Sequence, residues 1–135
     1  MSHWAMNYLG QPWQANAQGP GAWDCWSFFR HVQAERYGVN VPIIDIDAMN
    51  LHAVAHAFNG HEERGNWEEV SEPRDGDAVL MAHNRYPSHV GVWLEIDGGG
   101  VLHCQQGSGV IFTRKAMLAH MGWAHAKYYR ARRPA

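Results

Sequence analysis

The sequence lacks any excess of positive charge: eleven lysine and arginine residues stand against thirteen aspartate and glutamate residues, for a formal net charge of -2. Domains that bind nucleic acids usually carry a basic surface, so no nucleic-acid partner is expected. No run approaches the roughly twenty apolar residues that a transmembrane helix needs, and no membrane insertion is expected. The beginning of the chain has neither the basic nor the long apolar segment of a secretion signal. We therefore expect synthesis in the cytoplasm without a signal peptide.

Cysteine is scarce, with only Cys25 and Cys104 in the chain. Two thiols can form one disulfide, supply part of a metal site or include a nucleophile, and a reducing cytosol disfavours a structural disulfide. Tryptophan, histidine and glycine are abundant by contrast, with seven, ten and fourteen residues. A length of 135 residues and a hydrophobic share of 46% predict one compact domain over residues 1–135. The role of each thiol is then the main question that the sequence poses.

A helix is predicted over residues 25–37. Residues 10–23, which precede it, hold three glycines and two prolines, a composition typical of a loop. Asp24 has the chemistry of an N-cap, and Gly38 is a common residue at a helix end. Between them, apolar residues recur at helical spacing. Cys25 is therefore expected in the first turn of a helix.

A second helix is predicted over residues 47–58, where one side is apolar. Within it, His52 and His56 have the spacing of a pair of metal ligands. The glutamate that follows the first histidine in zinc-protease helices is missing, so no metal is expected.

The second half of the chain is predicted to form a small antiparallel sheet. The glycine-rich segment 97–100 between two apolar runs indicates a hairpin. A short helix, capped by Thr113 and running to about Met121, is expected before the last strand. The predicted strands cover residues 78–82, 89–96, 101–106, 110–112 and 123–132.

The first turn of a helix favours thiolate chemistry at Cys25. Unpaired backbone N–H groups and the helix dipole stabilise negative charge there and lower the pKa of a thiol. The same N–H groups, that of Cys25 included, can donate to an oxyanion. His89, at the start of a predicted strand, is the candidate general base. His103, on the next strand, can accept the proton on the other nitrogen of His89 and fix its tautomer.

Strand alternation places the two histidines on particular faces of the sheet. His89 shares a face with Gly91 and Trp93, and the valines and leucine between them look like core. On the next strand Cys104 points to the face opposite His103. If His103 faces Cys25, Cys104 does not, which disfavours both a disulfide between the two cysteines and a metal site that uses both.

A structural role for Cys25 stays open on the residues alone, because a cysteine in an apolar helix is often a small core residue. The neighbouring tryptophans, Trp13, Trp23 and Trp26, suit a substrate groove and suit ordinary loop packing equally well.

Five short motifs, in order, resemble the NlpC-type family of papain-like cysteine peptidases. Together they span nearly the whole chain. The Asp-Cys-Trp form of the second motif is more similar to the phage tail-tip and tail-assembly branch than to the secreted housekeeping enzymes. The motifs are GQPW at 10–13, GAWDCWS at 21–27, RDGDAVL at 74–80, SHVGVWL at 88–94 and VLH at 101–103.

The resemblance implies an α+β fold with papain-like topology, permuted so that the helix with the cysteine precedes a small antiparallel sheet with the histidine. It implies hydrolysis of amide bonds in peptidoglycan stem peptides, commonly between D-glutamate and a diamino acid. Cys25 would be the nucleophile, His89 the general base and acid, and His103 the residue that orients His89. No metal or organic cofactor is implied.

The resemblance also implies an oxyanion site and substrate cleft beside Cys25, formed by Tyr8, Trp13, Asp24, Trp26 and Ser88. Many relatives have tyrosine where this chain has Trp13. Its indole N–H, the Tyr8 hydroxyl or the backbone alone could take over the stabilisation of the oxyanion. Trp26 replaces a small residue after the cysteine and places a bulky ring beside the nucleophile.

On this resemblance we expect a peptidoglycan hydrolase that forms part of a phage tail or a tail-like delivery apparatus. Its partners would be the stem peptide and phage tail proteins, and it would act in the cell-wall or periplasmic space after delivery. One alternative is an injected antibacterial amidase effector with the same triad and an immunity protein as partner. Another is a catalytically silent structural module of a tail tip, and a third is an acyltransferase or deamidase on the same scaffold.

Overall fold

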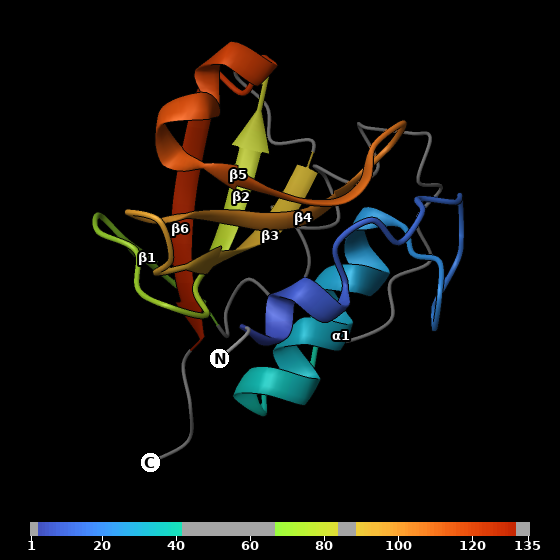
Figure 1. Ribbon diagram of the computed structural model, residues 1–135. Coiled ribbons are helices and arrows are strands. Elements are labelled where there is room, and N and C mark those ends of the chain that lie inside the picture. The colour runs from blue at the N-terminus through green and yellow to red at the C-terminus, as the bar shows by residue number, and fades with distance from the viewer. Residues whose placement is uncertain (1–2, 42–66, 84–88, 132–135) are drawn as a thin grey trace.

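One helix packs against an antiparallel sheet in the computed structural model, which describes residues 3–41, 67–83 and 89–131 (Figure 1). This arrangement confirms the predicted α+β class. In chain order the elements are η1 (Trp4–Asn7), α1 (Cys25–Tyr37), β1 (Trp67–Val70), β2 (Ala78–Ala82), β3 (His89–Leu94), β4 (Gly100–Gln105), β5 (Gly109–Arg114), η3 (Lys115–Met117), η4 (Ala119–Met121) and β6 (His125–Ala131).

Helix α1 begins and ends where the sequence predicts. The Asp24 carboxylate accepts the backbone N–H of Ser27 at 2.8 Å, and the Ser27 hydroxyl oxygen accepts the backbone N–H of Asp24 at 3.1 Å. This capping box satisfies N–H groups that have no partner inside the helix. At the other end, Gly38 adopts the left-handed conformation with φ of 67°, which costs glycine little. The first helical residue is therefore Cys25.

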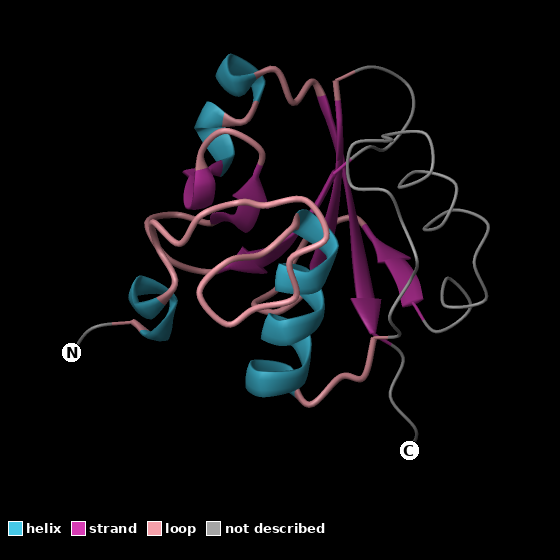
Figure 2. Ribbon diagram, turned by 90° about the vertical axis from the view of Figure 1, so that its right-hand side faces the viewer, coloured by secondary structure: helices cyan, strands magenta, loops and turns pink. Residues whose placement is uncertain are grey.

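The six strands found in the described part of the chain form one antiparallel sheet in the order β1-β6-β2-β3-β4-β5. Strands β2, β3, β4 and β5 pair in chain order as a meander. Strand β6 returns to lie between β1 and β2. Figure 1 shows α1 beside the sheet and the η3 and η4 turns at the other end of the molecule. Figure 2 shows the loop before α1 crossing in front of the helix.

Two apolar clusters cover the two faces of the sheet. The larger one joins the even-numbered residues of β3 and β4 to α1 through Phe28, Phe29 and Val32. The smaller one joins the odd-numbered Trp93 and Val101 to Leu118 and Trp123, residues of the segment between β5 and β6. Because successive side chains of a strand alternate, β3 and β4 send residues into both clusters. Within the described residues, no helix is long and apolar enough to span a membrane.

The predicted helix cap at Thr113 is wrong, and the predicted helix over 47–58 is not tested. Thr113 is not a helix cap: it lies inside β5, and η3 begins after Arg114, whose side chain makes no capping bond. Extended pairing with β4 continues through Thr113, since Val101 is its register partner. The helix expected over 47–58, with His52 and His56, lies outside the described residues.

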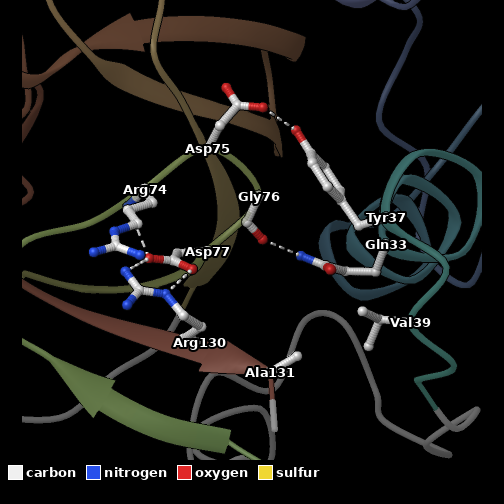
Figure 3. Close-up of a pocket in the computed structure, with 9 residues that line it drawn as sticks. All are labelled: Gln33, Tyr37, Val39, Arg74, Asp75, Gly76, Asp77, Arg130 and Ala131. Carbon is white, nitrogen blue, oxygen red and sulfur yellow. Dashed lines mark hydrogen bonds and ion pairs between the residues drawn. The ribbon is translucent and has the colours of Figure 1, made fainter. Parts of the chain in front are cut away.

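A pocket of about 400 Å³ lies at the C-terminal end of α1, where the turn before β2 meets β6 (Figure 3). Its polar groups are bonded to one another. Asp77 receives Arg130 through two nitrogens, at 3.1 and 2.8 Å, and also the backbone N–H of Arg74 at 2.7 Å. The Tyr37 hydroxyl donates to Asp75 at 2.7 Å, and Gln33 donates to the carbonyl of Gly76 at 2.9 Å. These bonds tie the end of α1 to the sheet.

Replacing Asp77 by alanine is expected to lower the free energy of unfolding by about 2 kcal/mol, because buried Asp77 loses its partly exposed partner Arg130 and the backbone N–H of Arg74 loses its acceptor. Urea denaturation at neutral pH measures this loss. Asp75→Ala is the matched control on the same turn. Asp75 is exposed, so its loss is expected to cost about 1 kcal/mol or less. An equal cost for both variants would contradict a special role of the buried Asp77 carboxylate.

Candidate active site

A hydrogen-bonded pair of histidines lies on two adjacent strands. His89 Nε2 and His103 Nδ1 are 2.8 Å apart, and the two ring planes stand at 73°. His89 is the first residue of β3, and His103 lies near the end of β4. Since Nε2 of His89 is used in this bond, Nδ1 is the nitrogen that is left to exchange a proton with another group. It makes no hydrogen bond within the described part of the chain, and His89 keeps 7% of its surface exposed.

A glycine lets the second histidine approach. Gly91 lies on the same face of β3 as His89, and a Cβ placed on it would stand 2.4 Å from Val101 and 3.0 Å from the Cβ of His103. Such distances exclude any side chain without displacement of its neighbours. The lack of a side chain at Gly91 therefore gives His103 the space that it occupies beside His89.

The second ring nitrogen of His103 is hydrogen-bonded to a hydroxyl group. Its Nε2 lies 2.9 Å from Oγ1 of Thr113 on β5, and that hydroxyl donates in turn to Sδ of Met121 at 3.5 Å. His103 is fully buried, and Thr113 is 3% exposed. Both nitrogens of His103 are thus bonded within the protein, so its ring cannot rotate without the loss of a buried hydrogen bond.

Trp123 lies against the ring of His89. The two rings are nearly parallel, at 10°, with centroids 5.0 Å apart. His83 also stacks on Trp123, at 4.0 Å, and its Nδ1 lies 2.7 Å from the carbonyl oxygen of Gly122. Trp123 therefore restricts the plane of the imidazole that the sequence identifies as the candidate base.

Cys25 opens α1, as the sequence predicts, but its pKa is not lowered. Burial and the Asp24 carboxylate, with a smaller effect of Cys104, raise the pKa of the thiol to about 12, although the backbone N–H groups of Trp26 and Cys25 act in the opposite direction. The expectation of a depressed thiol pKa is therefore wrong for this state of the protein. Here the cost of burying a negative charge exceeds the stabilisation of the thiolate by the helix N-terminus.

The imidazoles are neutral in the same state. Burial, followed by the neighbouring His103 and His83, lowers the pKa of His89 well below its usual value of 6.5. Burial lowers the pKa of His103 to about 4. At neutral pH the site therefore holds a thiol and a neutral imidazole, and any thiolate must form by transfer of its proton to a base.

The structure brings His89 and His103 together but does not join them to Cys25. Within the described ranges Cys25 makes no hydrogen bond to either histidine. Cys25 begins the helix that packs on the even-numbered residues of β3 and β4, whereas His89 and His103 belong to the odd-numbered set.

Cys104 differs from its predicted position. It faces the same side of the sheet as α1, with Sγ 3.4 Å from the carbonyl of Trp23, and it is close enough to Cys25 to raise the pKa of that thiol. The expectation that Cys104 does not face Cys25 is therefore wrong, because it required His103 to point at the helix. Both cysteines are free thiols.

The other predicted cleft residues are mostly occupied in packing. Tyr8 bonds His31, at the middle of α1, with 2.9 Å between the tyrosine hydroxyl and Nε2. Trp13 is partly buried against the larger cluster and forms a bridge with Trp23. The bond to His31 places the Tyr8 hydroxyl away from the first turn of the helix.

Next to the cysteine, Asp24 and Trp26 are both buried. Asp24 acts as the helix cap, and its carboxylate also raises the pKa of Cys25. The ring of Trp26 packs on Phe29, with centroids 5.5 Å apart. Ser88 lies outside the described residues.

Sequence reasoning missed the positions of Thr113 and Trp123 beside the histidines. A signal for Thr113 was available: Val101, His103 and Thr113 all fall on one face of two paired strands. Trp123 follows η4 outside any strand, and no periodic pattern indicates where its side chain lies. No group of three or more potential metal ligands occurs among the residues that the structure describes.

Acid is expected to destabilise the fold through the histidine pair. The unfolded chain takes up a proton on each histidine near pH 6.5, whereas folded His103 does so only near pH 4, so stability is complete above 6.5 and falls as the pH drops toward 4. One pKa unit corresponds to about 1.4 kcal/mol, which makes the loss from His103 alone about 3 kcal/mol. Urea denaturation at several pH values measures it. His103→Gln should weaken the pH dependence, and an unchanged dependence in that variant would refute the assignment.

The model of the NlpC/P60 family matches residues 10–132. Among solved structures, the NlpC/p60 domain of the peptidoglycan hydrolase SagA aligns with a TM-score of 0.59 and 20% identity over 94% of this chain and 92% of that one. A Bacteroides fragilis protein provisionally described as a xylanase aligns with a TM-score of 0.55 and 13% identity over 93% and 98%. No curated protein sequence matches the chain.

Proposed function

The chain belongs to the NlpC/P60 family, and we propose that it is a cysteine peptidase of the bacterial cell wall. The proposed substrate is the stem peptide of peptidoglycan, and the proposed scissile bond is the amide between D-glutamate and a diamino acid. The structurally similar SagA domain belongs to a protein named as a peptidoglycan hydrolase. No metal or organic cofactor takes part in the proposed reaction.

The hydrogen bond between His89 and His103 carries this proposal. It uses Nε2 of His89 and leaves Nδ1 as the nitrogen that can accept a proton. An imidazole held in this way, with a pKa lowered by burial, is a neutral base at physiological pH.

In the proposed mechanism, the Cys25 sulfur attacks the amide carbonyl carbon while its proton passes to Nδ1 of His89. A C–S bond forms, and His89 returns the proton to the leaving amine as the C–N bond breaks. Water then attacks the thioester, with His89 as base, and the Cys25 thiol and a new carboxylate are released. The first step requires Cys25 and His89 to come within hydrogen-bonding distance, and such catalytic bonds often tighten only when substrate binds.

Backbone N–H groups are the proposed oxyanion donors. Those of Cys25 and Trp26 already face the sulfur, since both lower the pKa of the thiol. An oxyanion formed beside the sulfur would take over these donors. Tyr8 is not proposed for this role, because its hydroxyl bonds His31.

We further propose that the enzyme reaches the cell wall as part of a phage tail or a tail-like apparatus. This proposal depends on the Asp24-Cys25-Trp26 motif, whose form is similar to that of tail-associated relatives. In this setting the cut opens the wall locally, and location is supplied by a partner of the tail.

Digestion of purified sacculi tests the function. The products are identified by mass spectrometry, with the Cys25→Ala chain as the matched control. We expect the native chain to release peptides shortened at the D-glutamate bond, each cut adding one water. Release of sugar fragments with intact stem peptides, or equal release by both chains, would refute the proposal.

A further inference from the structure

We propose that Thr113 is a positioning residue of the reaction: its hydroxyl oxygen accepts the Nε2–H of His103 and so keeps Nδ1 of His103 free to accept the Nε2–H of His89. This inference rests on the proposed function, because it concerns the same base. It assigns a role to a residue of β5 that lies behind both histidines and touches no substrate.

The direction of the hydrogen bonds follows from the chemistry of the base. When His89 has taken the thiol proton on Nδ1, both of its nitrogens carry hydrogen, so Nε2 can only donate. Its partner at 2.8 Å, Nδ1 of His103, must then accept. A neutral imidazole with an accepting Nδ1 carries its proton on Nε2. The group 2.9 Å from that nitrogen, Oγ1 of Thr113, must therefore accept as well.

Met121 provides the place for the hydroxyl proton of Thr113. A hydroxyl that accepts from His103 still has one hydrogen to donate, and the Met121 sulfur lies 3.5 Å away in donor geometry. The chain of bonds therefore runs from His89 through His103 and Thr113 to Met121 in one direction. Every proton of this chain has an acceptor while His89 is positively charged.

The reverse direction would disable the base. If His103 carried its proton on Nδ1, it would donate to Nε2 of His89 and force the proton of neutral His89 onto Nδ1. That nitrogen could then not accept a proton from the Cys25 thiol. His103 and Thr113 are both buried, so water does not readily replace the acceptor that Thr113 supplies. A hydroxyl at this position therefore affects which tautomer the site adopts.

Two variants separate this role from packing. Thr113→Val keeps the shape of the side chain and removes the acceptor, whereas Thr113→Ser keeps the hydroxyl and removes a methyl group. We expect valine to lower kcat by about 10- to 100-fold with little change in KM, as for other residues that orient a functional group from behind. Serine should restore most of kcat. Equal losses in both variants would mean that packing is responsible and would overturn the proposal.

A spectroscopic measurement tests the proposal without any peptidoglycan. The ¹⁵N chemical shifts of the imidazoles report which nitrogen of each histidine is protonated. At neutral pH we expect His103 to carry its proton on Nε2 in the native chain and in Thr113→Ser, and a substantial Nδ1–H population in Thr113→Val. A native His103 protonated on Nδ1 would overturn the proposal.

The rate of Cys25 alkylation by iodoacetamide adds a measure of base strength that needs no substrate. It should fall in Thr113→Val and recover in Thr113→Ser, and an unchanged rate in Thr113→Val would contradict the positioning role. If the native chain cuts no peptidoglycan while the tautomers and alkylation rates behave as expected, the proposed substrate is wrong and the role of Thr113 stands. Thermal unfolding of each variant verifies that the compared chains are folded.

Discussion

Replacement of Cys25 by alanine is expected to lower kcat/KM on a defined muropeptide by about 10⁴-fold or more. Loss of the nucleophile removes the covalent pathway, and His89 can then act only on water, which is a much weaker nucleophile than a thiolate. Because the pKa of the thiol is raised, Cys25 is protonated at neutral pH. A protonated thiol reacts only when a base accepts its proton, so the native activity is expected to depend on such a base. Mass spectrometry of the product peptides over time gives kcat/KM for the native chain and for Cys25→Ala.

Cys104→Ala is the matched control for the nucleophile. Cys104 is the other free thiol, is fully buried and faces the same side of the sheet as α1. Its removal deletes one sulfur from the core and should leave kcat/KM within about threefold, at a cost in stability on the order of 1 kcal/mol. If Cys104→Ala were the inactive chain and Cys25→Ala the active one, the assignment of the nucleophile would be wrong.

Replacement of His89 by alanine is expected to lower kcat/KM by about 10³-fold, since general acid–base catalysis by one side chain contributes on this scale. The alkylation rate of Cys25 by iodoacetamide should fall in the same variant, because the neutral imidazole is the proposed acceptor of the thiol proton. Both rates are measured near pH 7, where His89 is uncharged.

His83→Ala is the control for this change. His83 stacks on Trp123 as His89 does, but it is exposed and bonds a backbone carbonyl of the neighbouring loop. Its removal should leave kcat/KM nearly unchanged. Equal losses in the two variants would indicate that both histidines act by holding Trp123, and the proton-transfer role of His89 would be refuted.

Local signals made α1 predictable. Asp24 at the start, apolar residues at helical spacing and Gly38 at the end each act within a few residues, so the bounds of the helix agree with the structure. The turn at 97–100 had the same local character and correctly predicted the hairpin of β3 and β4. The position of Cys25 at a helix N-terminus needed no knowledge of the fold.

Alternation along each strand predicted part of the site. It placed His89 and Trp93 on the face opposite Val92 and Leu94, and His103 opposite Cys104, as the structure has them. It did not tell which of the two faces meets α1, because that choice depends on how distant segments pack. For this reason the expected position of Cys104 was wrong.

Long-range pairing accounts for the remaining differences. Strand β1 was not predicted: Trp67 pairs with Ala131, near the other end of the described chain. Thr113 was expected to cap a helix, yet pairing of β5 with β4 keeps it in the sheet. Likewise, the thiol pKa depends on burial by the folded chain, which outweighs the helix terminus that the sequence revealed.

The meander of β3, β4 and β5 has a consequence for how the molecule forms. His89, His103 and Thr113 belong to consecutive strands joined by short turns, whereas Cys25 comes from near the beginning of the chain. Contacts between residues close in sequence cost less loop-closure entropy and tend to form early in folding. We therefore expect the hydrogen-bonded group of His89, His103 and Thr113 to form as a local unit. The Cys25 thiol would join it only when α1 packs on the sheet. A folding intermediate with the meander formed and α1 not yet packed would hold the two bonded histidines without the nucleophile.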